Sequence, residues 1–90
     1  MRQLTILAEK VWNKAKKIKG FDPNIIREDP YGIPIIHDLY GIRDIGGWEM
    51  DHIIAKAIGG PTILRNLQAL NWKINVLKRT SLKKRSRHNQ

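Results

Sequence analysis

The chain has 90 residues with 17 Lys and Arg, eight Asp and Glu and no cysteine, so its formal net charge is +9. This length provides one small domain with a modest core, and the lack of cysteine excludes a disulfide framework, a thiolate zinc site and a cysteine nucleophile. No apolar run approaches the roughly 18 residues of a membrane-spanning helix, and charged residues interrupt the apolar ones near Met1, so we expect an intracellular protein (cytoplasmic, nuclear or virus-associated) without a secretion signal or a membrane partner.

The first element is predicted at residues 4–19. Apolar residues recur there at the spacing of one helix face: Leu4, Leu7, Ala8, Val11, Ala15 and Ile18. Gly20 is a natural C-terminal stop. We therefore expect an amphipathic helix whose lysines either face solvent or contact a polyanion.

Glycine and proline divide the next segment, residues 20–34, into turns. One helical turn is expected at residues 24–27. Residues 34–40 have the composition of a short strand, which Gly41 would close. A glycine-containing loop is expected to follow this strand.

Residues 47–82 predict a ββα unit. Residues 48–54 alternate in the manner of a strand, and residues 55–65 form a loop broken by glycine and proline. Residues 66–70 would form a return strand, and residues 71–82 would form a helix.

The predicted helix of this unit has two distinct faces at about 100° per residue. One face is expected to pack on the core: Leu70, Ile74, Leu77 and Ser81. The side chains expected to point away from the core are Trp72, Asn75, Lys78 and Arg79. Residues 83–90 are expected to be a frayed basic tail. The predicted fold class is a small α+β domain over residues 1–90, in which an amphipathic helix and a short strand precede the ββα unit.

The charge of the chain is unevenly distributed. All eight acidic residues lie within residues 1–51, whereas residues 52–90 contain nine Lys and Arg and no acid. Such a field of one sign attracts a polyanion and releases its counterions on contact. The alternative is a basic tail that only increases solubility.

Four polar side chains of the ββα unit suit phosphodiester chemistry: Asp51, His52, Asn66 and Asn75. An imidazole with a pKa near its usual value of about 6.5 can take a proton from water at neutral pH. A carboxylate and an amide oxygen are hard donors that suit Mg²⁺ or Mn²⁺. If the helix folds back on the strands, the Asn75 amide can lie opposite Asp51 and His52.

The residues around these four form a longer pattern. It reads Gly47-Trp48-Glu49-Met50-Asp51-His52-Ile53-Ile54, then Gly59-Gly60, then Asn66-Leu67-Gln68-Ala69-Leu70, then Trp72 with Asn75 and Lys78. This pattern closely resembles the signature of the HNH (ββα-metal) endonucleases, including the HNH domain of CRISPR effector nucleases. Several upstream residues are similar to those of compact stand-alone HNH proteins: Val11-Trp12-Asn13-Lys14-Ala15, Gly20, Asp22-Pro23, Arg27, Asp29, Tyr31-Gly32 and Tyr40-Gly41. The resemblance therefore covers most of the chain.

The resemblance implies a role for each site residue. His52 would be the general base that activates water, and Asn66 would hold the loop that bears His52 through hydrogen bonds to the backbone. Asp51 and Asn75 would bind one catalytic divalent ion, with Mg²⁺ favoured and Mn²⁺ or Ni²⁺ as alternatives. Lys78 would lie close to the scissile phosphate.

The implied reaction is metal-dependent hydrolysis of DNA that leaves 5′-phosphate and 3′-hydroxyl ends. A single site would nick one strand with little sequence specificity, and a double-strand break would require a homodimer, a larger complex or two events. The cations expected to contact double-stranded DNA are Lys56, Arg65, Lys73, Lys78, Arg79, Lys83, Lys84 and Arg85.

The chain also departs from the family pattern. Asn75 stands where many members have His, which disfavours tight Zn²⁺ binding. Arg79 stands where the related bacterial toxin nucleases have another His, and Ala55 replaces a proline. Because the cysteines of the frequent zinc knuckle are missing, the N-terminal helix and the strand near Ile35 would have to support the ββα unit.

Two competing interpretations remain open. A non-catalytic HNH-fold protein could bind DNA as an architectural factor, although binding alone does not require the four polar residues. An RNA-directed basic protein of ribosomal type would explain the charge and leave the spacing a coincidence. His37 and His88 are expected to be non-catalytic, and the three tryptophans (Trp12, Trp48 and Trp72) are expected to pack in the core or at its rim.

Overall fold

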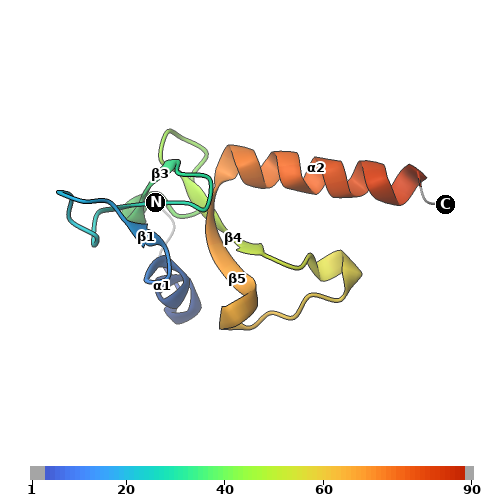
Figure 1. Ribbon diagram of the computed structural model, residues 1–90, viewed down its shortest axis with the longest axis horizontal. Helices are drawn as coiled ribbons and strands as arrows, with labels where there is room; N and C mark the ends of the chain where they lie inside the picture. Colours follow the sequence, from blue (N-terminus) through green and yellow to red (C-terminus); the bar gives the residue numbers. More distant parts are fainter. Residues whose placement is uncertain (1–3, 89–90) are drawn as a thin grey trace.

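The computed structural model describes the backbone of residues 4–88 and the side chains of residues 4–80 (Figure 1). The elements follow in the order α1 (Ile6–Trp12), β1 (Lys16–Lys17), β2 (Ile26–Glu28), β3 (Pro34–Ile36), β4 (Trp48–His52), β5 (Leu67–Asn71) and α2 (Trp72–His88). Three 3-10 turns lie at His37–Leu39, Lys56–Ile58 and Leu64–Asn66. This arrangement confirms the α+β class. Within the described part of the chain, neither helix combines the length and the apolar character needed to cross a membrane.

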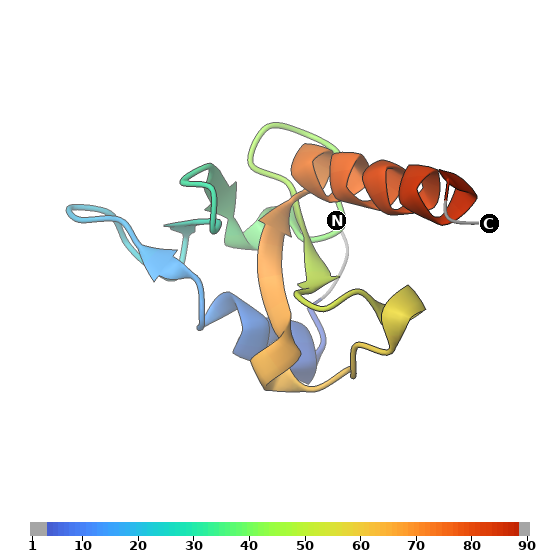
Figure 2. The same ribbon diagram turned by 45° about the vertical axis from the view of Figure 1, so that its right-hand side comes forward.

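The strands form two separate antiparallel sheets. β1, β2 and β3 make a small three-stranded sheet in the N-terminal half, and β4 pairs with β5 from Trp48↔Asn71 to His52↔Leu67. α2 follows β5 directly and extends away from the hairpin, as Figures 1 and 2 both show. β4, β5 and α2 therefore form the predicted ββα unit.

The core lies where α1 packs against β5 and the start of β4. Its largest fully buried side chains are Trp12, Trp48, Ile35, Leu67, Leu70 and Val11. The rings of Trp12 and Trp48 lie 5.4 Å apart, so the N-terminal helix and the ββα unit share one core. These contacts confirm the packing role expected for Trp12 and Trp48, while Trp72 is half-buried and donates its indole N–H to the carbonyl of Asp44.

The expected helix over residues 4–19 is wrong in its second half, because α1 ends at Trp12. The buried guanidinium of Arg27 explains this difference. Its Nη1 donates to the carbonyl oxygens of Asn13 and Ala15, at 3.2 and 3.0 Å. These carbonyls are the ones that a continuing helix would use for its own hydrogen bonds. The chain turns instead, and Lys16–Lys17 pairs with β2.

Two shorter expectations in the N-terminal half hold only in part. The helical turn expected at residues 24–27 lies slightly earlier, because the N–H groups of Ile25 and Ile26 both donate to the carbonyl of Asp22. β2, the central strand of the small sheet, already begins at Ile26. The strand expected at residues 34–40 ends at Ile36 and continues as a 3-10 turn. β1, β2 and β3 each have only two or three residues. The conformation of such a short strand depends on the strands that pair with it and not on its own alternation of apolar and polar residues.

α2 is longer than expected. It continues through His88 instead of ending near residue 82, so residues 83–88 of the expected frayed tail are helical. Residues 89–90 of that tail lie outside the described residues. Asn71 caps the start of α2, since its side-chain oxygen accepts from the backbone N–H of Lys73 at 3.0 Å.

Candidate functional site

One cleft brings together most of the predicted site residues. Asp51 and His52 reach it from β4, and Asn75 and Lys78 reach it from α2, around a volume of about 330 Å³. A neighbouring cleft of about 270 Å³ is also lined by His52 and Asn75. The strand and the helix therefore place the acid, the imidazole and the amide at one position on the surface.

The orientation of α2 differs from the expectation. Asn75 is only 6% exposed, whereas Leu77 is 62% exposed. The prediction that Leu77 packs on the core and that Asn75 points away from it is therefore wrong. α2 turns its polar residues, Asn75 and Lys78, toward β4, because they find partners on that strand.

Asp51 is held by two neighbours through one of its oxygens. Its Oδ2 accepts from Lys78 Nζ at 2.8 Å and from Gln68 Nε2 at 2.9 Å. Gln68 is the cross-strand neighbour of Asp51 on β5. These charge-assisted bonds offset the cost of burying a carboxylate that is 7% exposed. Oδ1 accepts no hydrogen bond from the described residues and remains available.

Lys78 has its ammonium group directed at β4. Besides Asp51, Nζ donates to the carbonyl oxygen of His52 at 2.7 Å. Lys78 therefore contacts other groups of the chain in this structure, and its expected contact with a phosphate stays a prediction. These contacts also link the middle of α2 to the end of β4.

His52 is half-buried at the end of β4, where the following loop reaches its ring. Its Nε2 lies 2.8 Å from the hydroxyl oxygen of Thr62. Nδ1 has no hydrogen-bond partner among the described residues. If the hydroxyl accepts from Nε2–H, Nδ1 carries the lone pair that can accept a proton. Thr62 was not anticipated, since a threonine in a loop carries no signal of its own.

Asn66 closes the loop between β4 and β5. Its Oδ1 accepts from the N–H of Ile54 at 2.9 Å, and its Nδ2 donates to the carbonyl of Pro61 at 2.8 Å. Nδ2 also donates to the carbonyl of Ile54 at 3.1 Å. The loop crosses so closely here that a Cβ added at Gly60 would overlap the carbonyl of Ile54. Asn66 therefore holds the backbone on both sides of the loop that begins directly after His52.

Glu49 belongs to the site, although sequence reasoning assigned it no role. Its Oε1 accepts from Asn75 Nδ2 at 3.1 Å and lies 3.9 Å from Arg79 Nη2. Strand alternation places Glu49 on the same face of β4 as Asp51, and this signal could have identified it. The missing information was that α2 packs on that face.

Among the residues whose side chains are described, the predicted DNA-contacting cations lie at several places on the surface. Lys56 and Arg79 line the cleft, and Arg65 is exposed on the 3-10 turn before β5. Lys73 instead lies 5.7 Å from the centre of the Trp72 ring, beside a separate apolar groove of about 770 Å³. The remaining expected cations have side chains outside the described residues: Lys83, Lys84 and Arg85.

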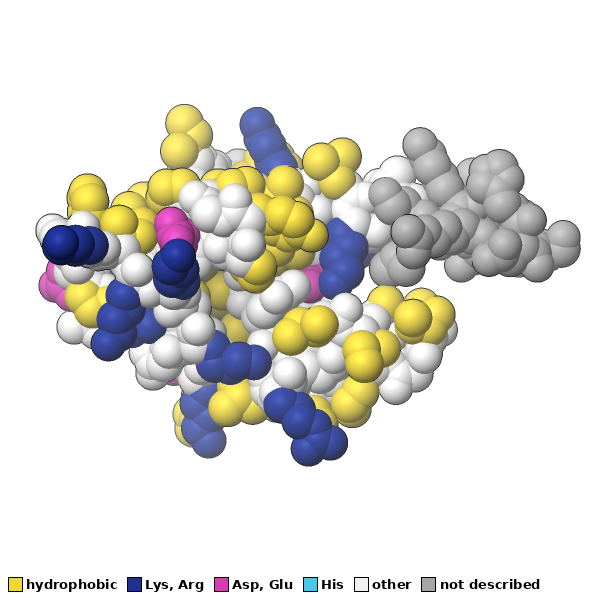
Figure 3. Space-filling model, in the orientation of Figure 1, with side chains coloured by type: hydrophobic (Ala, Val, Ile, Leu, Met, Phe, Trp, Pro, Cys, Tyr) yellow, Lys and Arg dark blue, Asp and Glu magenta, His cyan; other side chains and the backbone are white. Residues whose placement is uncertain are grey.

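Figure 3 shows the face seen in Figure 1. Lys and Arg side chains are spread over it, and hydrophobic side chains gather over the loop between β4 and β5. That loop carries exposed aliphatic residues, including Ile53, Ile54 and Ile58. The loop beside His52 therefore presents an apolar surface between scattered positive charges.

The residues of the cleft suit a hard cation with few protein ligands. Among the described residues, no group of three or more His, Cys, Asp and Glu side chains could hold a metal ion, so a closed zinc site is not built in this part of the chain. Asp51 Oδ1 and Asn75 Oδ1 accept no hydrogen bond from the described residues, and both side chains line the same cleft. Mg²⁺ retains several waters and needs only one or two such oxygens.

Comparison with protein-family models, with curated proteins and with solved structures finds no match for this chain. The geometry of the cleft and the sequence pattern are therefore the observations that bear on function.

Proposed function

We propose that this chain is a metal-dependent endonuclease of the HNH type that hydrolyses phosphodiester bonds of DNA. The observation that supports this most directly is the convergence of Asp51, His52 and Asn75 on one cleft. These residues lie up to 24 positions apart in the sequence, and two of them present oxygens that accept no hydrogen bond from the described residues. Among the described residues no buried side-chain nitrogen or oxygen lacks a hydrogen-bond partner, so these two oxygens are accessible to solvent, where a cation can reach them.

In this proposal His52 is the general base. In the tautomer whose Nε2–H donates to the Thr62 hydroxyl, Nδ1 carries the lone pair that accepts a proton from the attacking water. Asn66 keeps the backbone that follows the imidazole in place through its bonds to Ile54 and Pro61. The base is thus positioned before the substrate arrives.

Asp51 and Asn75 would hold the divalent ion. When bound, such an ion polarises the phosphodiester and stabilises the departing oxygen. Asp51 contributes negative charge, and its contact with Lys78 keeps the carboxylate oriented toward the cleft. The neutral amide of Asn75 adds a second hard oxygen, which favours Mg²⁺ or Mn²⁺ over Zn²⁺.

Affinity for DNA would come from backbone contacts. Residues 52–90 contain nine Lys and Arg and no acid, and phosphate contacts of this kind carry no sequence information. We therefore propose cleavage with little sequence preference, one strand at a time, leaving 5′-phosphate and 3′-hydroxyl ends.

The test is conversion of supercoiled plasmid to open circle with Mg²⁺, with Mn²⁺ and with EDTA. The wild-type chain should nick only with metal, and His52→Ala should lose nicking while its DNA affinity stays within about threefold, because one imidazole contributes little to phosphate contacts. His37→Gln is the matched control, since His37 lies on the 3-10 turn after β3 and lines neither cleft.

Tight plasmid binding without nicking under any metal would refute the proposal. It would favour an architectural DNA-binding protein in its place. Preferential binding and cleavage of RNA would instead reassign the substrate.

A further inference from the structure

The side chains of Glu49 and Asn75 face each other across the packing of α2 on β4. Asn75 Nδ2 donates to Glu49 Oε1 at 3.1 Å. The Glu49 side chain is 24% exposed, and Asn75 is buried. The contact is therefore partly shielded from water, which strengthens a hydrogen bond to a charged acceptor.

This contact determines which way the Asn75 amide points. An asparagine amide has a donating end and an accepting end, and its neighbours decide between the two orientations. A carboxylate offers only acceptors, so the NH₂ group must face Glu49. Reversing the amide would bring two oxygens together and lose the hydrogen bond.

The orientation has a consequence for the cleft. With Nδ2 committed to Glu49, Asn75 Oδ1 is left without a hydrogen bond from the described residues. Asp51 is arranged in the same way. Its Oδ2 accepts hydrogen bonds from Gln68 and Lys78, while its Oδ1 accepts none from the described residues. Each expected ligand is thus fixed through one atom and offers the other.

We infer that Glu49 is a positioning residue that holds the Asn75 amide with Oδ1 available to a divalent cation. This inference rests on the proposed function, because it assigns Asn75 to the metal. Glu49 lines the neighbouring cleft but not the cleft that contains Asp51. It therefore acts on the cation through Asn75.

The experiment measures Mn²⁺ affinity of the full chain by the paramagnetic resonance signal of free Mn²⁺, with no DNA present. Glu49→Ala and Glu49→Leu remove the acceptor, and both should weaken Mn²⁺ binding about tenfold, as losses of outer-shell partners do. Glu49→Gln keeps an acceptor oxygen at the same reach and should stay within about threefold of the wild type.

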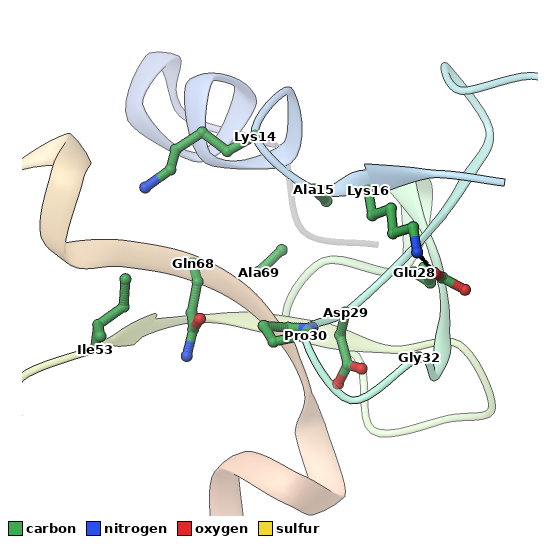
Figure 4. A pocket seen from close by; sticks show the side chains of 10 residues that line it. All are labelled: Lys14, Ala15, Lys16, Glu28, Asp29, Pro30, Gly32, Ile53, Gln68 and Ala69. Carbon is green, nitrogen blue, oxygen red and sulfur yellow. Dashed lines mark ion pairs between the residues drawn. The ribbon is translucent and has the colours of Figure 1, made fainter.

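Glu28→Ala is a matched control. The Glu28 side chain is also 24% exposed, lies on a strand and forms an ion pair, with Lys16 at 3.4 Å. Figure 4 shows this pair at the wall of a separate cavity. The cavity has a volume of about 420 Å³, and Asn75 does not line it. Its loss should leave Mn²⁺ affinity unchanged. Thermal unfolding of every variant identifies any that does not fold, and Glu49→Leu provides the second loss variant.

The outcomes separate this inference from the proposed function. If the wild type binds no Mn²⁺, the proposed metal site is refuted and the inference falls with it. If the wild type binds and both loss variants match it, only the role of Glu49 is refuted. A loss in Glu49→Gln as large as in Glu49→Ala would also overturn the inference, because the charge and not the acceptor atom would then be decisive.

Discussion

Replacing Asn66 with alanine should destabilise the protein without changing its core. The side chain is 6% exposed and makes three hydrogen bonds of 2.8 to 3.1 Å to backbone groups of Ile54 and Pro61. Each such bond contributes about 1 kcal/mol net, and a buried group left unpaired costs somewhat more. Because water can reach a surface loop, we expect a loss of about 2–3 kcal/mol in the free energy of unfolding.

For a domain of this size, that loss corresponds to a fall in Tm of roughly 8–24 °C. Thermal unfolding followed by circular dichroism measures it. Amide hydrogen exchange gives a local measurement, since the N–H of Ile54 loses its acceptor and should exchange faster than the amides of β4. The protein should also nick plasmid more slowly, because the loop after His52 is no longer held.

Asn13→Ala is the control for this prediction. Asn13 is exposed, and its side chain makes no hydrogen bond among the described residues, so its replacement should change the free energy of unfolding by less than about 0.5 kcal/mol. A loss in the free energy of unfolding as small for Asn66→Ala as for Asn13→Ala would refute the role of Asn66 in holding this loop. Exchange of the Ile54 amide at the wild-type rate would refute it as well.

Three further predictions address other parts of the chain. Gly60→Ala should lower Tm strongly in thermal unfolding, because the new methyl group meets a carbonyl across the loop. Burial lowers the pKa of His37, but the hydrogen bonds and charges of Asp38 and Glu9 outweigh this effect and raise the pKa above 6.5. These contacts should therefore stabilise the fold fully below pH 6.5 and lose their effect as the pH rises through the raised pKa. Urea unfolding of the wild type and of His37→Gln at several pH values measures this difference. Lys56→Ala should reduce the slope of log affinity for DNA against log salt by about one, and an unchanged slope would remove Lys56 from the interface.

The ββα unit could be predicted from the sequence because its signals are local. The alternating pattern of β4 stops at a loop that contains glycine and proline, and Asn71 lies where the helix begins. The structure has β4, β5 and the start of α2 within a few residues of their predicted positions. The same signals put Asp51 and His52 at the end of β4 and Asn66 directly before β5, and the longer sequence pattern assigned them to a site. Most of the hydrogen bonds that hold Asp51 and Asn66 join residues 12 to 27 positions apart and could not be predicted in this way.

The remaining parts depend on contacts between distant residues. The end of α1 depends on Arg27, whose partners lie 12 and 14 residues away in the sequence. The face of α2 that packs inward depends on polar partners on β4, which a pattern of apolar residues cannot reveal. For the same reason Glu49 was missed as a partner of Asn75, although strand alternation already placed it beside Asp51.

The N-terminal half supports the ββα unit at both ends of β5. Lys14 Nζ donates to the carbonyls of Leu64 and Leu67, both at 2.6 Å, where β5 begins. Asp29 Oδ2 accepts from the N–H of Asn71 at 3.1 Å, where β5 passes into α2. In a chain without cysteine, these two contacts and the shared tryptophan core fix the strand that carries Gln68, and through Gln68 they fix the carboxylate of Asp51. The support expected from the N-terminal half therefore reaches the cleft itself, so that loss of Lys14 or Asp29 would alter the site as well as the stability of the fold.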